Sequence, residues 1–324
     1  MLVLGLQGSP RRKSNTHFLL STFLSEAERQ GARTHLAEVC RMDIQPCKEL
    51  VVCEKKGTCP IKDDMTPTLY PLMREAEVVV AASPVFFYNV TSQLKAVIDR
   101  SQALWARKYR LRLKDPLDAT RKGVMLAVGA TGGKQLFDGL HLTAQYFFDA
   151  IAARYDERLM YRKIEHPGDM AAHPTVTADI KSVAARVMTP LARRRKILFT
   201  GDRDMDGPHM AAAFLQHLAA DRFDVACAGR APVSAPTKPM VAAMADKGID
   251  MAFRQTRAVN DMLAGESPEV IIAVNGAPGT GDGGRVPDES WEIPEAAGAS
   301  QGRMQQYRDA VETKVRRVID ERLP

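Results

Sequence analysis

A small polar and basic segment separates an apolar run from an amphipathic run near the start of the chain. Residues 2–6 are mostly apolar, and residues 7–16 read Gln-Gly-Ser-Pro-Arg-Arg-Lys-Ser-Asn-Thr. If a strand precedes this segment and a helix follows it, the segment lies at a helix N-terminus. Backbone N–H groups lack intrahelical partners there, and the helix dipole favours an anion. We therefore expect a phosphate group to bind here, with side-chain donors from Ser9, Arg11, Ser14, Asn15 and Thr16.

This segment differs from two familiar phosphate-binding motifs. It lacks the Gly-Lys-Ser/Thr ending of the P-loop and the Gly-x-Gly-x-x-Gly pattern of dinucleotide-binding folds. A plain helix cap is the alternative interpretation, in which Ser14 or Asn15 starts the helix and binds no ligand. The residues alone leave both interpretations open.

Hydrophobic patterning predicts a regular alternation of strands and helices in the first half of the chain. Short apolar strands are expected near residues 2–6, 34–39, 77–82, 123–129 and 156–161. Helices are expected over residues 14–31, 65–76, 91–105 and 140–153, the second kinked at Pro71. This order favours an α/β fold with a doubly wound parallel sheet, in which ligands bind outside the carboxyl ends of the strands.

Two more loops follow strands and fall at the same edge of the expected sheet. One offers aromatic side chains beside backbone amides, which suits an aromatic ring with polar edges, and the other has glycines that allow close approach of the backbone. The alternative is that the aromatic residues belong to the core and the glycines to turns. The candidates around a bound ring are Pro84, Val85, Phe86, Phe87, Tyr88, Asn89, Gly129, Ala130, Thr131, Gly132 and Gly133.

The character of the sequence changes after residue 162. His166-Pro167-Gly168 marks a linker, and residues 176–191 have a helical pattern. Strands and helices alternate again from residue 196 onwards. We expect a first domain over residues 1–162, a linker with a helix over 163–195, and a second, smaller α/β domain over 196–324.

The composition is that of a globular protein of two domains. The 324 residues are 45% hydrophobic and 26% charged, with a net charge of +6. Neither a run of about 20 apolar residues nor a signal peptide is visible, so we expect a cytoplasmic protein without membrane contact. The densest basic cluster, residues 193–196, has no interleaved aromatic residues, so we expect no nucleic-acid partner.

Gly8-Ser9-Pro10-Arg11 followed by Ser14-Asn15-Thr16 resembles the phosphate loop of the NADPH-dependent FMN reductase family and its iron–sulfur flavoprotein relatives. A longer stretch, residues 47–100, is similar to the core of the same family. This resemblance covers roughly residues 1–160. It implies a flavodoxin-like fold, FMN held by its phosphate, electrons from NAD(P)H or a protein donor, and homo-oligomers with flavins near subunit interfaces. Phe86 stands where a tyrosine is usual in that family, and Tyr88 where a glycine is usual.

Four of the five cysteines, at positions 40, 47, 53 and 59, lie close together in the sequence. In a reducing compartment such crowding indicates metal or redox chemistry before disulfides. This region resembles iron–sulfur flavoproteins, which have a Cys-x2-Cys-x2-Cys-x5-Cys run here. Cys47, Cys53 and Cys59 match three of those positions, but Leu50 occupies the second. Because a cluster generally needs four thiolates, we expect no iron–sulfur cluster and no metal site, and interpret the segment as a loop of free thiols.

The second unit resembles low-molecular-weight protein tyrosine phosphatases and arsenate reductases, on residues 210–215, 247–250 and 291–294. That family uses Cys-x5-Arg, whose thiolate attacks phosphorus. Alignment at Met210 puts Gly201 in the place of the cysteine and Gly207 in that of the arginine. Without the thiolate no covalent step is possible. We therefore expect a degenerate domain with neither phosphatase nor arsenate reductase activity.

Together these features predict an FMN-dependent oxidoreductase. It would move electrons from NAD(P)H to a small-molecule or protein acceptor as a homo-oligomer, and no residue stands out as catalytic. The alternative is a non-enzymatic flavodoxin-like electron carrier with the second unit as a docking or anion-sensing module.

Overall fold

The computed structural model describes residues 1–202, 205–230, 235–265, 267–276, 286–294 and 301–321. The chain forms two compact units. The first contains residues 1–112 and 120–192, and the second contains residues 113–119 and 193–324. The sequence did not suggest that a short segment in the first half would belong to the second unit.

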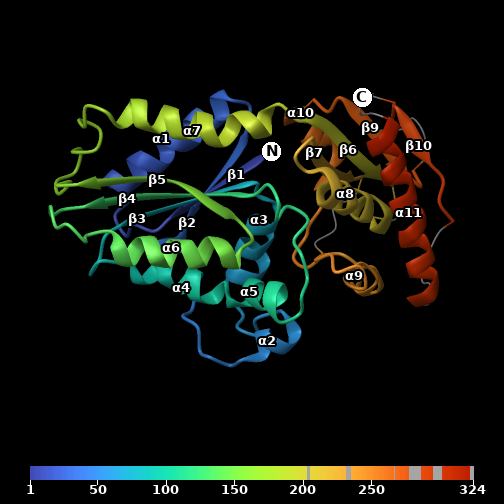
Figure 1. Cartoon of the computed structure of the whole chain (residues 1–324), viewed down its shortest axis with the longest axis horizontal. Helices are drawn as coiled ribbons and strands as arrows, with labels where there is room; N and C mark the ends of the chain where they lie inside the picture. Colours follow the sequence, from blue (N-terminus) through green and yellow to red (C-terminus); the bar gives the residue numbers. More distant parts are fainter. Residues whose placement is uncertain (203–204, 231–234, 266, 277–285, 295–300, 322–324) are drawn as a thin grey trace. The chain divides into compact units, whose positions relative to one another are not determined.

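A parallel sheet of five strands forms the centre of the first unit, in the order β2-β1-β3-β4-β5 (Figure 1). This is the flavodoxin-like strand order, so the fold expected for this part of the chain is confirmed. The central strands β1 and β3 consist almost entirely of buried residues, as expected for a sheet covered on both faces. The strands are β1 (Leu2–Gln7), β2 (Arg33–Glu38), β3 (Val78–Pro84), β4 (Lys122–Gly129) and β5 (Arg154–Arg162).

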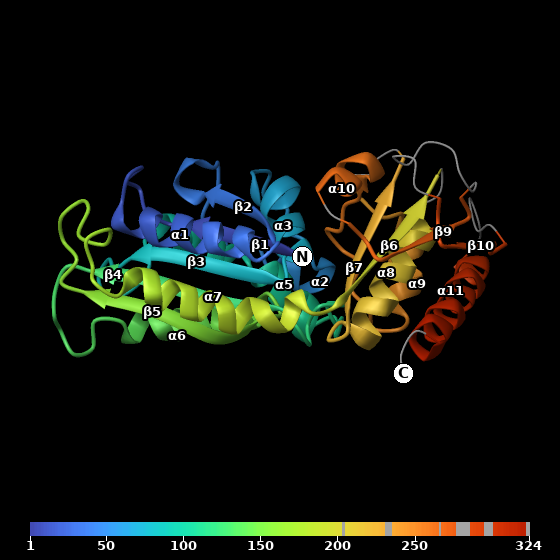
Figure 2. The same ribbon diagram turned by 90° about the horizontal axis from the view of Figure 1, so that it is seen from above.

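Helices cover both faces of this sheet. The helices α1 (Asn15–Arg29) and α7 (Val176–Ala192) lie on one face, and Figure 2 shows the sheet from their side. The other face carries α3 (Tyr70–Glu75), α4 (Ser92–Arg100), α5 (Gln102–Tyr109) and α6 (Asp138–Ala150). Leu20 and Phe23 of α1 share one apolar cluster with Ile180 and Val187 of α7. The helix that the sequence placed in a linker is therefore part of the first unit.

Two prolines divide the helix expected over residues 65–76. A π-helical turn, Met65–Leu69, contains Pro67, and α3 then begins with Pro71 in its first turn. Proline is tolerated at that position because the first N–H groups of a helix have no intrahelical acceptor. At the position of the expected kink, the structure changes from π-helical to α-helical hydrogen bonding.

A buried ion pair fixes the base of the cysteine-containing segment. Arg100 of α4 donates to both carboxylate oxygens of Asp63, at 2.5 and 3.1 Å, and both side chains are fully buried. The same guanidinium donates to the carbonyl of Gln45, and Tyr70 donates to the carbonyl of Arg100. The segment between residues 45 and 63 is thus attached to α4 at both ends. Its only helix is the short α2 (Val52–Lys56).

The second unit contains another parallel sheet, in the order β10-β9-β6-β7-β8. Its strands are β6 (Arg195–Gly201), β7 (Phe223–Gly229), β8 (Arg257–Ala258), β9 (Val270–Val274) and β10 (Glu289–Trp291). Ile197 and Phe199 pack with α8 (Asp206–Ala219) and α11 (Gln301–Glu321) on one face, while Leu198 packs with α10 (Val259–Gly265) on the other. In the segment from the first half of the chain, Lys114 donates its backbone N–H to Gly248 and accepts from Asp250. An α/β unit is therefore confirmed here, whereas its likeness to phosphatases stays a prediction.

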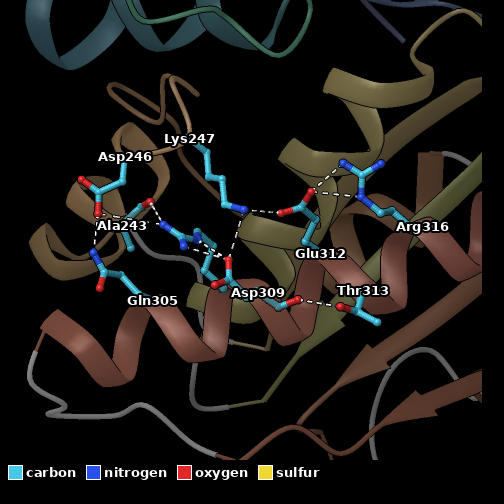
Figure 3. Close-up of polar contacts among 9 residues, drawn as sticks. Ala243, Asp246, Lys247, Gln305, Asp309, Glu312, Thr313 and Arg316 are labelled. Carbon is cyan, nitrogen blue, oxygen red and sulfur yellow. Dashed lines mark hydrogen bonds and ion pairs between the residues drawn. The ribbon is translucent and has the colours of Figure 1, made fainter.

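Polar contacts attach α11 to α9 (Lys238–Ala245) and the turn after it (Figure 3). Lys247 lies 3.3 Å from a carboxylate oxygen of Asp309 and 3.0 Å from one of Glu312. Gln305 donates to Asp246 at 2.6 Å, and Arg308 donates to the carbonyl of Ala243. These contacts attach the long helix to α9 and to the turn that follows it. Within the described ranges, no helix is both long and apolar enough to cross a bilayer.

We expect Asp63→Ala to destabilise the first unit by about 3–5 kcal/mol, because it leaves the buried Arg100 charge without its partner. Burial alone would raise the pKa of Asp63, but hydrogen bonds from Arg100, Gln45 and Met65 outweigh it and lower the pKa below 3.8. The stabilisation is therefore present above the ordinary pKa of an aspartate and is lost as the pH falls through the lowered pKa. Urea titrations followed by circular dichroism at several pH values measure both effects.

Asp99→Ala is the matched control, because it removes an exposed carboxylate that pairs with Lys95 on the same helix. We expect a change below about 0.5 kcal/mol. Equal destabilisation by the two substitutions would show that the buried pair has no special role.

Candidate functional site

The polar segment after β1 is the corner from which the candidate site is built. The backbone N–H of Gly8 donates to Ala82 at 2.8 Å, and its carbonyl accepts the hydroxyl of Thr91 at 2.6 Å. A Cβ on Gly8 would lie 2.9 Å from the Cβ of Leu94. Glycine is therefore required here so that α4 can pack against the end of β1.

The first turn of α1 holds a buried hydroxyl that has no hydrogen-bond partner. Ser14 caps the helix, since its hydroxyl accepts the N–H of His17 at 3.0 Å. Thr16 is only 1% exposed, and the described residues supply no partner for its Oγ1. Such a group costs about 1–3 kcal/mol. Its position suits a ligand that accepts hydrogen bonds at a helix N-terminus.

A cavity of about 260 Å³ opens beside this turn. Typical enclosed ligand pockets hold about 300–1,000 Å³, so this one suits a phosphate and part of the chain attached to it, with a larger ring at the rim. Arg11 and Lys13 supply positive charge, and neither forms an ion pair with a described residue. The lining residues are Ser9, Pro10, Arg11, Lys13, Ser14, Asn15, Thr16, Pro84, Val85, Phe86, Val128, Ala130, Ile164, Glu165 and Pro167.

The loop after β3 reaches the cavity and then turns sharply. Phe86 and Asn89 exchange two backbone hydrogen bonds, of 2.8 and 2.9 Å, around the two residues between them. Both of those residues have positive φ, 46° at Phe87 and 63° at Tyr88. The side chains of Phe86, Phe87 and Tyr88 are all exposed. Of the three aromatic residues, Phe86 lines the cavity, and Phe87 and Tyr88 follow it in the turn.

The loop after β4 is held by the end of β5. Gly129 accepts the N–H of Ile164 at 3.1 Å, and Thr131 accepts that of Lys163 at 3.3 Å. Arg162 donates to the carbonyl of Gly133 at 3.1 Å. The loops after β3 and β4, whose residues were predicted to surround a bound ring, are called the two ring loops below. Both lie at the carboxyl edge of the sheet, as parallel strands require.

The segment after β5 lies across the phosphate corner and is held by Asn15. The amide of Asn15 donates to the carbonyl of His166 at 2.8 Å, and its oxygen accepts the N–H of Met170 at 3.1 Å. The carboxylate of Asp169 accepts the N–H groups of His166 and Glu165, which lowers the pKa of Asp169. This segment was expected to be a linker, but the structure makes it one wall of the cavity.

The structure brings nine of the predicted cofactor-binding residues together around the cavity. Phe87, Tyr88 and Asn89 lie beyond them in the turn, and Gly129, Thr131, Gly132 and Gly133 lie in the second ring loop. The roles predicted for all of these residues stay predictions. The nine that line the cavity are Ser9, Arg11, Ser14, Asn15, Thr16, Pro84, Val85, Phe86 and Ala130.

Sequence reasoning missed the wall formed by Ile164, Glu165 and Pro167. A signal was present, because this segment directly follows a strand whose carboxyl end lies at the same edge. The proline and glycine at positions 167 and 168 were interpreted as a linker instead.

Residues 1–152 match the NADPH-dependent FMN reductase family. An iron–sulfur flavoprotein of Methanosarcina thermophila is 31% identical over 149 residues, which are 44% of this chain and 74% of that protein. The chain belongs to the NADPH-dependent FMN reductase family. This confirms the sequence prediction of an NAD(P)H-dependent FMN reductase-like oxidoreductase and flavoprotein at the level of the family.

Other relatives of this FMN reductase family member also align with only part of the chain. An iron–sulfur flavoprotein of Archaeoglobus fulgidus is 37% identical over 137 residues, and the chain spans 66% of its length and 42% of its own. A solved NAD(P)H:quinone oxidoreductase from Methanothermobacter marburgensis is 16% identical, with a TM-score of 0.45 over 58% of this chain and 96% of that one. The family match ends at residue 152, before the second unit begins again at residue 193.

The names of these relatives call for a test of the cysteine segment against an iron–sulfur cluster. Burial raises the pKa of the Cys53 thiol, and the nearby Cys59 raises it further. Cys47 is exposed, and its sulfur accepts the N–H of Glu49. Within the described ranges, no three Cys, His, Asp or Glu side chains are arranged to hold a metal. As they lie, the thiols do not fit a cluster, and our expectation of none stays a prediction.

We expect Thr16→Val to weaken FMN binding roughly ten- to a hundredfold, because a hydrogen bond to a charged group contributes about 1.5–3 kcal/mol. The same change should leave the apoprotein as stable as the wild type or more so, since it removes a buried hydroxyl without a partner. Fluorescence titration with FMN and urea denaturation of the apoprotein measure the two quantities.

Ser14→Ala is the control, because it removes the helix cap and should lower apoprotein stability by about 1 kcal/mol. If Thr16→Val destabilised the apoprotein and left FMN affinity unchanged, the hydroxyl would have a structural role only.

We expect Asn15→Ala to release the segment around His166 and Met170, because both of its hydrogen bonds to that segment are lost. Hydrogen exchange at the Met170 amide should become faster, and FMN affinity should fall severalfold. Mass spectrometry and FMN titration of the same preparation measure both. Faster exchange with unchanged affinity would show that the segment covers the cavity without contributing to binding.

Proposed function

We propose that this chain is an FMN-dependent oxidoreductase that takes electrons from NAD(P)H and passes them to a small-molecule or protein acceptor. The observation that carries the proposal is the buried Thr16 hydroxyl, which has no partner among the described residues and lies at a helix N-terminus beside a cavity. An FMN phosphate offers the acceptor oxygens that this hydroxyl and the nearby backbone N–H groups need. Membership of the NADPH-dependent FMN reductase family supports the same conclusion.

The residues of this chain would bind and orient the cofactor. Thr16, Ser9 and the first turn of α1 would hold the phosphate, and Arg11 would supply the facing positive charge. The ring would lie against residues 84–89 and 129–133. FMN, when bound, supplies reversible uptake and release of electrons, and the protein sets its position and surroundings.

The second unit has a different role in this proposal. The loop after β6 reads Gly-Asp-Arg-Asp-Met-Asp-Gly and has no cysteine, so nucleophilic phosphatase or arsenate reductase chemistry is not expected. We propose that this unit docks a partner or mediates assembly of a homo-oligomer. A cytoplasmic location agrees with cysteines that are all free thiols.

The decisive experiment mixes FMN-loaded protein with NADPH and then NADH under anaerobic conditions. We expect rapid loss of the flavin absorption near its visible maximum, because the proposed reaction transfers electrons from the nicotinamide to the flavin. A visible spectrum with iron and acid-labile sulfide analysis of the same sample tests for a cluster, of which we expect none.

Three outcomes separate the alternatives. Rapid bleaching supports the reductase, and no bleaching by either nicotinamide supports an electron carrier reduced by another protein. If the wild-type chain is folded and binds no FMN, both flavoprotein functions are overturned. The Asp99→Ala variant should then also be folded and bind no FMN.

A further inference from the structure

The two-residue turn at the rim of the cavity has a backbone that its residues do not favour. Positive φ at both central residues is the shape of a type I′ turn, which prefers Asn and Gly. Here the central residues are Phe87 and Tyr88, at φ 46° and 63°. Bulky residues in this region are strained, and such strain clusters at functional sites.

The turn holds Tyr88 between the two ring loops. Its carbonyl oxygen lies 2.8 Å from the point that a Cβ on Gly139 would occupy, so the turn packs closely on the first turn of α6. Its hydroxyl lies 3.9 Å from the point that a Cβ on Gly133 would occupy. The side chain therefore extends from the loop after β3 to the loop after β4.

The other two aromatic side chains of the turn lie differently. Phe86 lines the cavity itself. Phe87 is 103% exposed, so its ring touches nothing in the unit that could fix it across the opening. Tyr88 is 56% exposed and has the second loop beside its hydroxyl. Of the three, Tyr88 is the one placed to limit entry at the rim.

We propose that Tyr88 determines which acceptors this chain can use, by narrowing the opening between the two ring loops so that small planar acceptors reach the flavin more readily than larger ones. This inference rests on the proposed function. It concerns the second half of the reaction, in which the reduced flavin meets its acceptor. A glycine at this position would leave the opening without a side chain.

Tyr88→Gly is the informative substitution, because glycine removes the ring and also suits the positive φ. The variant should therefore fold and bind FMN. Tyr88→Phe is the matched control, since it keeps the ring and loses only the hydroxyl. Tyr146→Ala, which removes an exposed tyrosine from α6 outside the cavity lining, controls for loss of an aromatic surface residue.

The experiment uses FMN-loaded full-length chains whose flavin is reduced by light with EDTA as the sacrificial electron donor, so that the result does not depend on NADPH. Each reduced protein is mixed with p-benzoquinone, which has one ring, or with phenanthrenequinone, which has three. Every rate is divided by the wild-type rate for the same acceptor, which cancels the reduction potential of that acceptor. Iodide quenching of the bound flavin's emission reports access to the ring without any turnover.

We expect Tyr88→Gly to raise the relative rate with phenanthrenequinone about tenfold, the scale on which pocket shape discriminates between substrates. The relative rate with p-benzoquinone should change much less, and iodide quenching should become stronger. Tyr146→Ala should resemble the wild type in all three measurements, and Tyr88→Phe should keep the wild-type ratio between the rates of the two acceptors.

Equal changes for both acceptors in Tyr88→Gly, or the same changes in Tyr146→Ala, would overturn the proposal. A wild-type chain that binds no FMN would instead overturn the proposed function, because that failure appears before any acceptor is added. A strong effect of Tyr88→Phe would overturn the steric account, since that variant keeps the ring.

Discussion

The structure of the candidate site depends on hydrogen-bonding groups that the first turn of α1 cannot satisfy by itself. Ser14 caps one backbone N–H, but Thr16 keeps a buried hydroxyl without a partner. When this turn folds against β1, hydrogen-bond donors without acceptors therefore lie at one fixed point. A cavity lies beside them, and no described side chain fills that space.

The two ends of the proposed cofactor site are built in different ways. At the phosphate end, Gly8 lets α4 pack against β1, and Asn15 holds the segment that forms the far wall. At the ring end, a turn with two strained residues carries exposed aromatic side chains. In our proposal, the phosphate end would fix the position of the cofactor, and the turn would control access to its ring.

The sequence predicted those parts of the fold that depend on local patterns. Buried strands, the start of α1 at Ser14 and the break at Pro71 each follow from the types of a few adjacent residues. The parallel sheet then brings three loops to one edge, so most of the cavity could also be predicted. The wall at residues 164–167 could not, because a proline and a glycine there have the same local pattern as a linker. The sequence also could not show that residues 113–119 belong to the second unit, because this depends on backbone pairing with a distant segment.

The second unit shows why a strand–loop–helix corner does not by itself make an enzyme. The corner between β6 and α8 repeats the arrangement of β1 and α1, with a helix N-terminus at the carboxyl end of a central strand. A covalent mechanism at such a corner needs a nucleophile on the loop, and the sequence of this loop has none. The one cysteine of this unit, Cys227, lies within β7 opposite Phe199 of β6. The thiol is therefore part of the sheet and not of the loop. A role in binding or assembly is what the architecture of this unit can still support.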